Sequence, residues 1–177
     1  MVVENLLQKA RTTIVSYAVI AIMAAIMLMA APVLLLQGAF AAPTLQGPIT
    51  CSIVVEKNQL RCTADISGLG GAKTATATLV ATATVTTGCA TPSASNQPQG
   101  LQRTAITVTD TQTVNVEGGR ATFDLLTQPL NAEELRTCPD GMKPTVVCVT
   151  FSNISIAVIP NSGPSKTFTT NQVISNC

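Results

Sequence analysis

Six cysteines carry the clearest chemistry in this sequence, because thiols can form disulfides and thiolates can bind zinc. They all lie beyond residue 41, at Cys51, Cys62, Cys89, Cys138, Cys148 and Cys177. An even number of cysteines in an exported chain favours disulfides. Zinc is the alternative, but the cysteines are widely spaced and the chain has no histidine. We therefore expect disulfides, and neither a metal nor another cofactor.

The cysteine spacing favours one pairing more strongly than the others. Two alternating stretches, Ile49–Val55 and Leu60–Ser67, predict a β-hairpin that places Cys51 opposite Cys62. Six cysteines allow about 15 pairings, so the remaining four stay open. Their order in the chain suggests the pairs Cys89–Cys138 and Cys148–Cys177.

Carboxylates are the other residues that could do chemistry. Glu133, Glu134 and Asp140 could bind calcium, but their spacing is not that of an EF-hand loop. Asn131 precedes the two glutamates as a helix N-cap would, so a short helical turn over Ala132–Arg136 with capping acids is the simpler interpretation. The chain has no His and no Trp. The commonest general base is therefore missing, and we expect no enzyme activity, catalytic residue or small-molecule substrate.

The N-terminal segment predicts export. Charged residues at 4, 9 and 11 precede an apolar run, Ile14–Leu36, which ends in small residues. A signal peptidase would cut between Ala41 and Ala42, but the run is also long enough to remain as an uncleaved anchor. We therefore expect residues 1–41 to be a signal peptide or anchor. Residues 42–177 should then be one domain, secreted or on the extracytoplasmic cell surface, with the membrane contacted only through the N-terminal segment.

Period-two patterns dominate this domain. Lys73–Thr87 alternates threonine with alanine or a larger aliphatic residue, as a β-strand with one buried face does. Because 15 residues exceed a usual strand, we expect a bend near Leu79–Ala81 and two segments. Short strands and frequent turn residues along the domain predict an antiparallel β-sandwich, immunoglobulin-like in outline.

Local signals add detail to this sandwich. Gly118–Gly119 predicts a two-residue hairpin turn that places Glu117 opposite Arg120 and Val114 opposite Phe123. Asp110 and Gln112 interrupt an inward-facing pattern and suggest a bend, and Gly88–Gln102 is rich in turn residues and predicts an exposed loop. The apolar phase changes near Ser152–Asn153, which predicts a β-bulge. Asn153 also begins a glycosylation sequon, whose alternative interpretation is simply a polar bulge residue.

The chain combines the export segment and the alternating Ala/Thr strand with a set of turns and cysteines: Cys51, Cys62, Gly68-Leu69-Gly70, Cys89 and Cys138-Pro139-Asp140-Gly141-Met142. In this arrangement it resembles small exported, cysteine-containing β-rich proteins of bacteria and archaea that have no assigned activity. The resemblance implies a fold and a location, and no catalytic residues.

Charge and composition narrow the functional classes. From Ala42 onward eight acidic residues balance eight basic residues, so a nucleic-acid partner is not expected. We expect a non-enzymatic secreted or cell-envelope structural protein. The alternatives are adhesion or self-association through an exposed strand edge or the threonine-rich face, with another copy or the cell surface as partner. A more remote alternative is an ice-binding surface made by the regular threonines.

Overall fold

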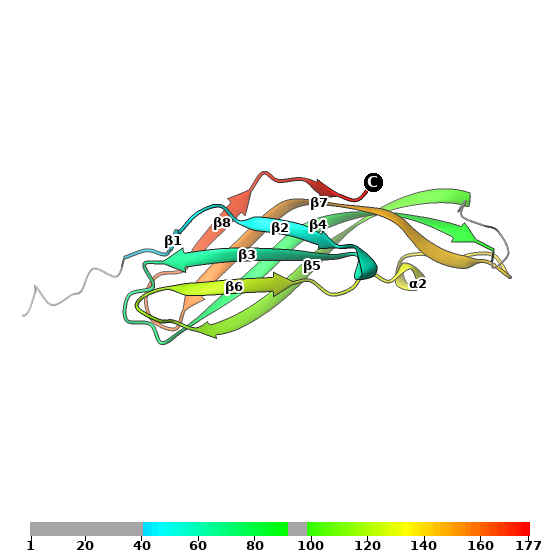
Figure 1. Ribbon diagram of the computed structural model, residues 1–177. Coiled ribbons are helices and arrows are strands. Elements are labelled where there is room, and N and C mark those ends of the chain that lie inside the picture. Colours follow the sequence, from blue (N-terminus) through cyan, green and yellow to red (C-terminus); the bar gives the residue numbers. More distant parts are fainter. Residues whose placement is uncertain (1–40, 92–98) are drawn as a thin grey trace, which may run out of the picture. The chain divides into compact units, whose positions relative to one another are not determined.

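The computed structural model describes residues 41–91 and 99–177 of the chain. The apolar stretch Ile14–Leu36 lies outside the described residues, and within them no helix is long and apolar enough to cross a membrane. Two antiparallel sheets pack against each other (Figure 1). Sheet A contains β1 (Thr44–Leu45), β2 (Thr50–Val54), β3 (Gln59–Ser67) and β6 (Ala121–Leu126). Sheet B contains β4 (Thr74–Ala90), β5 (Gln99–Asn115), β7 (Lys143–Pro160), β8 (Lys166–Thr170) and β9 (Ile174–Ser175).

Each sheet is organised around long central strands. In sheet A, β3 pairs with β1 and β2 along one edge and with β6 along the other. In sheet B the order is β5-β4-β7-β8, and β9 continues beside β7 beyond the end of β8. All these pairs are antiparallel, so the predicted antiparallel sandwich is confirmed.

The threonine/alanine alternation of β4 creates the inner face of sheet B. Ala75, Ala77, Leu79, Ala81, Ala83 and Val85 are buried, and the residues between them are half-buried on the opposite face. Larger side chains fill the space left by these alanines, because tight packing needs small residues to face large ones. They come from both sheets and include Leu60, Ile66, Phe123, Phe151, Ile156 and Phe168.

β4 is one strand, and the expected division into two segments is wrong. It pairs with β5 without interruption from Thr74 to Thr87 and lies entirely in sheet B. The irregularity near Ala81 belongs to β7, where Val80 pairs with Ser155 but Thr82 pairs with Ser152. The extra residue is accommodated at Asn153, whose φ of 52° is left-handed. The predicted β-bulge at Ser152–Asn153 is therefore confirmed, and the partner strand absorbs the irregularity expected in β4.

The Gly118–Gly119 turn is present, but the strands it joins separate into different sheets. Glu117 and Arg120 form the expected bridge, with N–H···O distances of 2.9 and 3.0 Å in the two directions. Beyond this bridge β5 continues in sheet B and β6 in sheet A. The expected pairing of Val114 with Phe123 is therefore wrong: their strand partners are Ala75 and Ala64, respectively. The turn connects the two layers at one corner of the sandwich.

β5 also departs from the prediction of a bend at Asp110 and Gln112. Its pairing with β4 is regular through both residues. The irregularity lies near its start, where Gly100 has a φ of 64° and the register shifts opposite Gly88. A glycine in the left-handed region is the usual first residue of such a bulge. The predicted loop Gly88–Gln102 is correspondingly shorter, because β4 runs to Ala90 and β5 starts at Gln99.

Three disulfides crosslink the described structure, one within sheet A and two from sheet B to segments outside its strands. Cys51–Cys62 links β2 to β3, Cys89–Cys138 links the end of β4 to the segment after helix α2 (Ala132–Leu135), and Cys148–Cys177 links β7 to the last residue. These are the pairs that the sequence suggested. Cys51 and Cys62 are direct partners across the β2–β3 hairpin, which is closed by the 3-10 turn η2 (Val55–Lys57). Three disulfides are typical of an oxidising, extracytoplasmic compartment.

Candidate functional site

The outer face of sheet B carries a two-dimensional array of hydroxyl groups, which we term the hydroxyl face. Residues that are direct partners in the ladders point to the same face of a sheet, so the register places these side chains in adjacent rows. The rows consist of Thr74, Thr76, Thr78, Thr82 and Thr84 on β4, Thr107, Thr109, Thr111 and Thr113 on β5, Thr150, Ser152 and Ser155 on β7, and Thr167 and Thr169 on β8.

Neighbouring hydroxyls of this face bond to each other. Thr76 and Thr113 hydroxyl oxygens lie 2.8 Å apart, and those of Thr78 and Thr111 lie 3.2 Å apart. Such cross-strand threonine pairs stabilise a sheet by about 0.2–1 kcal/mol each. Part of the hydroxyl face is therefore engaged in holding β4 to β5.

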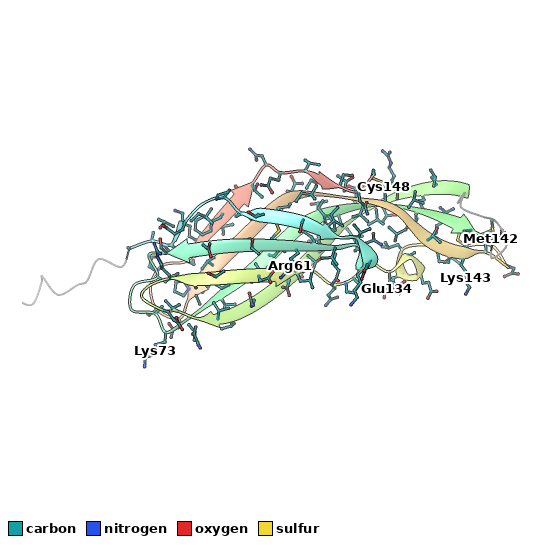
Figure 2. All side chains as sticks on the ribbon, viewed as in Figure 1. Arg61, Lys73, Glu134, Met142, Lys143 and Cys148 are labelled. Atoms are coloured by element: carbon teal, nitrogen blue, oxygen red, sulfur yellow. A yellow bond between two sulfur atoms is a disulfide. The ribbon has the colours of Figure 1, made fainter. Side chains whose placement is uncertain are left out.

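The outer face of sheet A differs in chemistry, because it contains ionised groups. The Arg61 guanidinium donates two hydrogen bonds to the Asp124 carboxylate, and the Thr122 hydroxyl lies 2.6 Å from Asp65. The hydrogen bonds from Arg61 lower the pKa of Asp124. Arg61, on β3 of sheet A, is labelled in Figure 2. The outer face of sheet A thus carries an ion pair, whereas the rows of the hydroxyl face carry uncharged groups.

Two polar side chains of β5 cover the open edge of β6. The Asp110 carboxylate accepts a hydrogen bond from the Leu126 amide at 2.8 Å, and the Gln112 side-chain oxygen accepts one from the Asp124 amide at 2.9 Å. We term this contact the β5–β6 seam. Unpaired amides on an edge strand are a template for strand addition, so the seam blocks that edge. It also explains why two polar residues occupy inward-facing positions of β5.

The outer edge of β5 is less protected. β5 is the terminal strand of sheet B, and no other described strand pairs with its second edge. Beside Ile106–Thr109 a hollow of about 190 Å³ separates β5 from Gln128–Leu130 and Glu134. Towards its start the strand exposes Leu101 and Ala105. Natural edge strands usually carry charges or irregularities, and in this half Arg103 and the Gly100 bulge are the features of that kind.

Arg136 holds the segment after α2 against sheet B. Its guanidinium donates hydrogen bonds to the carbonyl oxygens of Thr87, at 3.0 Å, and Gly100. These carbonyls lie at the β4–β5 register shift, where ladder bonds are interrupted. The Thr87 hydroxyl next to this contact is buried and has no hydrogen-bond partner in the described structure. Arg136 therefore satisfies backbone acceptors and forms part of the scaffold.

The carboxylates considered as calcium ligands do not form a cluster. The side-chain oxygen of Asn131 accepts a hydrogen bond from the Glu133 amide at 3.1 Å, as an N-cap does, and α2 spans Ala132–Leu135. Asp140 lies in the predicted turn, where the Met142 amide bonds to the Pro139 carbonyl oxygen at 3.1 Å. Within residues 41–91 and 99–177 no group of three or more His, Cys, Asp or Glu residues is placed to hold a metal ion.

A second hollow, of about 400 Å³, opens at the β7 bulge. We term it the bulge hollow. The sequence did not predict it, because its second wall is the β8–β9 connection, which is distant in sequence: Asn171 lies 18 residues after Asn153. The exposed Asn153, the sequon residue, lies in it beside residues of both walls: Ser152, Ile154, Ser155, Thr169, Thr170, Asn171, Gln172 and Val173. The phase change in β7 was the only sequence signal for this place.

Comparisons with known proteins identify no family. No family model matches the chain, and no curated protein matches its sequence.

Proposed function

We propose that the protein is a non-enzymatic structural protein of the secreted space or the cell surface. The observation that carries this proposal is that partly buried polar side chains hydrogen-bond to the backbone of neighbouring elements. Asp110, Gln112 and Arg136 each hydrogen-bond to backbone groups of another element. These groups therefore contribute to holding the scaffold together.

The disulfides support the same role. They fix the hairpin of sheet A, the far end of β4 and the C-terminus. A domain whose core is rich in alanine buries less apolar area per residue, and crosslinks compensate by restricting the unfolded chain. Such construction suits a protein that must persist outside the cytoplasm without chaperones.

We further propose that the sandwich is immunoglobulin-like in outline. Its strand neighbours support this relationship: β2-β3-β6 in sheet A follow the order A-B-E, and β4-β7-β8 in sheet B follow C-F-G. Many cell-surface domains share this architecture, which agrees with the proposed location but does not by itself assign a function.

The structural role is tested by replacing carboxylates, since Asp and Glu are common acid–base residues and the chain has no histidine. In cells lacking the protein, each aspartate and glutamate of the domain is restored as Asn or Gln and scored for envelope resistance to detergent. We expect every variant that keeps the wild-type unfolding midpoint to restore resistance. A single conservative exchange that abolishes rescue while leaving the unfolding midpoint unchanged would contradict the proposal.

A second candidate function is self-association through the first half of β5. The open edge of this strand favours it, because the corresponding edge of β6 is covered by the β5–β6 seam. Sedimentation velocity over a range of concentrations should show a larger species, and Ala105→Lys should abolish it. Thr63→Lys on exposed sheet A is the matched control. A single monomeric species at all concentrations would exclude this candidate.

A further inference from the structure

The bulge hollow exists because two ladders beside β7 stop short of each other. The β7–β8 ladder ends at the pair Ile154–Thr170, and the β7–β9 ladder starts at the pair Phe151–Ile174. Between them the connection 171–173 lies opposite the bulge at Asn153 and has no ladder partner on β7. An opening therefore interrupts this edge of sheet B.

Both walls of the opening are fixed to the scaffold. One wall is β7, whose Ile154 is fully buried and forms the floor. In the other wall, the Gln172 amide donates to the Thr170 hydroxyl at 3.3 Å, and its side-chain nitrogen donates to the Ile49 carbonyl oxygen at 3.2 Å. This second bond ties the β8–β9 connection to the start of sheet A. The hollow is thus formed by the native fold itself.

The polar groups of the hollow are all uncharged. Hydroxyls come from both walls, and amides come from Asn153, Asn171 and Gln172. Hydroxyls and carboxamides both donate and accept hydrogen bonds. Val173, which is 66% exposed, adds an apolar side chain to the lining. A suitable ligand would need several groups that also donate and accept, together with a small apolar face.

We propose that the bulge hollow binds a neutral saccharide unit. Sugar hydroxyls match the mixed donor and acceptor character of the walls, and the C–H groups of the ring can contact Val173. The volume of about 400 Å³ falls in the range of small-ligand sites. A charged ligand would lose hydration without gaining an opposite charge, which disfavours uronic acids and sugar phosphates. An extended peptide fits less well, because the ladder gap spans only the connection 171–173.

The proposal is tested by titrating the oxidised, ¹⁵N-labelled protein with methyl glycosides of glucose, galactose, mannose and N-acetylglucosamine, and with chitobiose and cellobiose. At least one should shift the amide signals of residues 152–155 and 169–173, with a Kd of about 1–10 mM, as expected for a small ligand with few apolar contacts. Glucuronic acid and glucose 6-phosphate should bind at least about tenfold more weakly.

Two variants remove wall groups and one serves as a control. Asn153→Gly suits the left-handed backbone at this position, and Asn171→Ala removes an exposed amide. Each should weaken saccharide binding about fivefold, the effect of one lost hydrogen bond, while the domain keeps its folded amide spectrum. Asn115→Ala, at the end of β5, should change nothing.

Four results would overturn the proposal, the first three of which concern saccharides. These three are no shift with any neutral saccharide at 50 mM, shifts centred on another surface, or equal binding of the charged sugars. A Ser/Asn-rich peptide that binds residues 152–155 and 169–173 as tightly as the best saccharide would also overturn it.

Discussion

Removing the Asp110 carboxylate tests the role of the β5–β6 seam. In Asp110→Ala the Leu126 amide loses its acceptor at 2.8 Å, and in Gln112→Ala the Asp124 amide loses its acceptor at 2.9 Å. Both side chains lie on the half-buried face of β5, so the released amides remain beside protein atoms and water replaces the lost acceptors only in part.

The expected cost follows from the type of each hydrogen bond. A bond to a charged group contributes about 1.5–3 kcal/mol and a neutral one about 0.5–1.5 kcal/mol. Because Leu126 is 41% exposed, water recovers part of the loss. We therefore expect each alanine variant to lose about 1 kcal/mol of unfolding free energy, and the double variant about 2 kcal/mol. Asp110→Asn keeps an oxygen acceptor and should lose less.

The assay is urea unfolding of the oxidised proteins at neutral pH, followed by sedimentation velocity. Thr109→Val is the control, because it removes a hydroxyl from the same strand on the opposite face and should change stability by less than about 0.5 kcal/mol. The double variant should also form larger species, since it exposes the β6 edge. If the double variant matches the control in both stability and sedimentation, the seam does not protect this edge.

Three other predictions concern the disulfides, a buried hydroxyl and an ion pair. Replacing Cys89 and Cys138 by alanine opens a 49-residue loop and should lower the unfolding free energy by about 4 kcal/mol. Replacing Cys51 and Cys62 opens an 11-residue loop and should lower it by about 3 kcal/mol. Urea unfolding that reverses this order contradicts the chain-entropy argument. Thr87→Val removes the unpartnered hydroxyl and should raise the unfolding free energy by about 1 kcal/mol, so a lower urea midpoint would mean that this hydroxyl has a partner. The lowered pKa of Asp124 means that its ion pair stabilises the fold above the pKa of an unfolded carboxyl, about 4, and that this stabilisation is lost as the pH falls through the lower folded value. The urea midpoint of Asp124→Asn should therefore lie below that of the wild type at pH 7 and approach it at pH 2; an unchanged difference contradicts this origin.

Local patterns predicted individual strands because they depend on neighbours in sequence. The alternation in β4, the β2–β3 hairpin and the bulge in β7 follow from side-chain periodicity, turn residues and a change of phase. The Cys51–Cys62 pair follows from hairpin register in the same way. Each of these features is determined within about twenty residues.

Two of the errors, the Val114–Phe123 pairing and the bend at Asp110 and Gln112, arose where the chain passes from sheet B to sheet A. The turn at Gly118–Gly119 looks the same whether its strands stay paired or separate into two layers. The outcome is decided by strands elsewhere in the chain, because β3 pairs with β6 and β4 pairs with β5. Once the strands separate, Asp110 and Gln112 cease to be interruptions and become the groups that cover the open edge of β6.

The candidate sites show the same division. The sequence by itself determined that β4 has a threonine face, that Cys51 pairs with Cys62, and that Asn153 lies at a bulge. Tertiary structure alone decided that hydroxyl side chains of four strands share one face and that Thr169–Val173 forms the second wall beside Asn153. The physical reason is that strand periodicity fixes which face a side chain occupies, whereas the register between distant strands fixes what lies beside it.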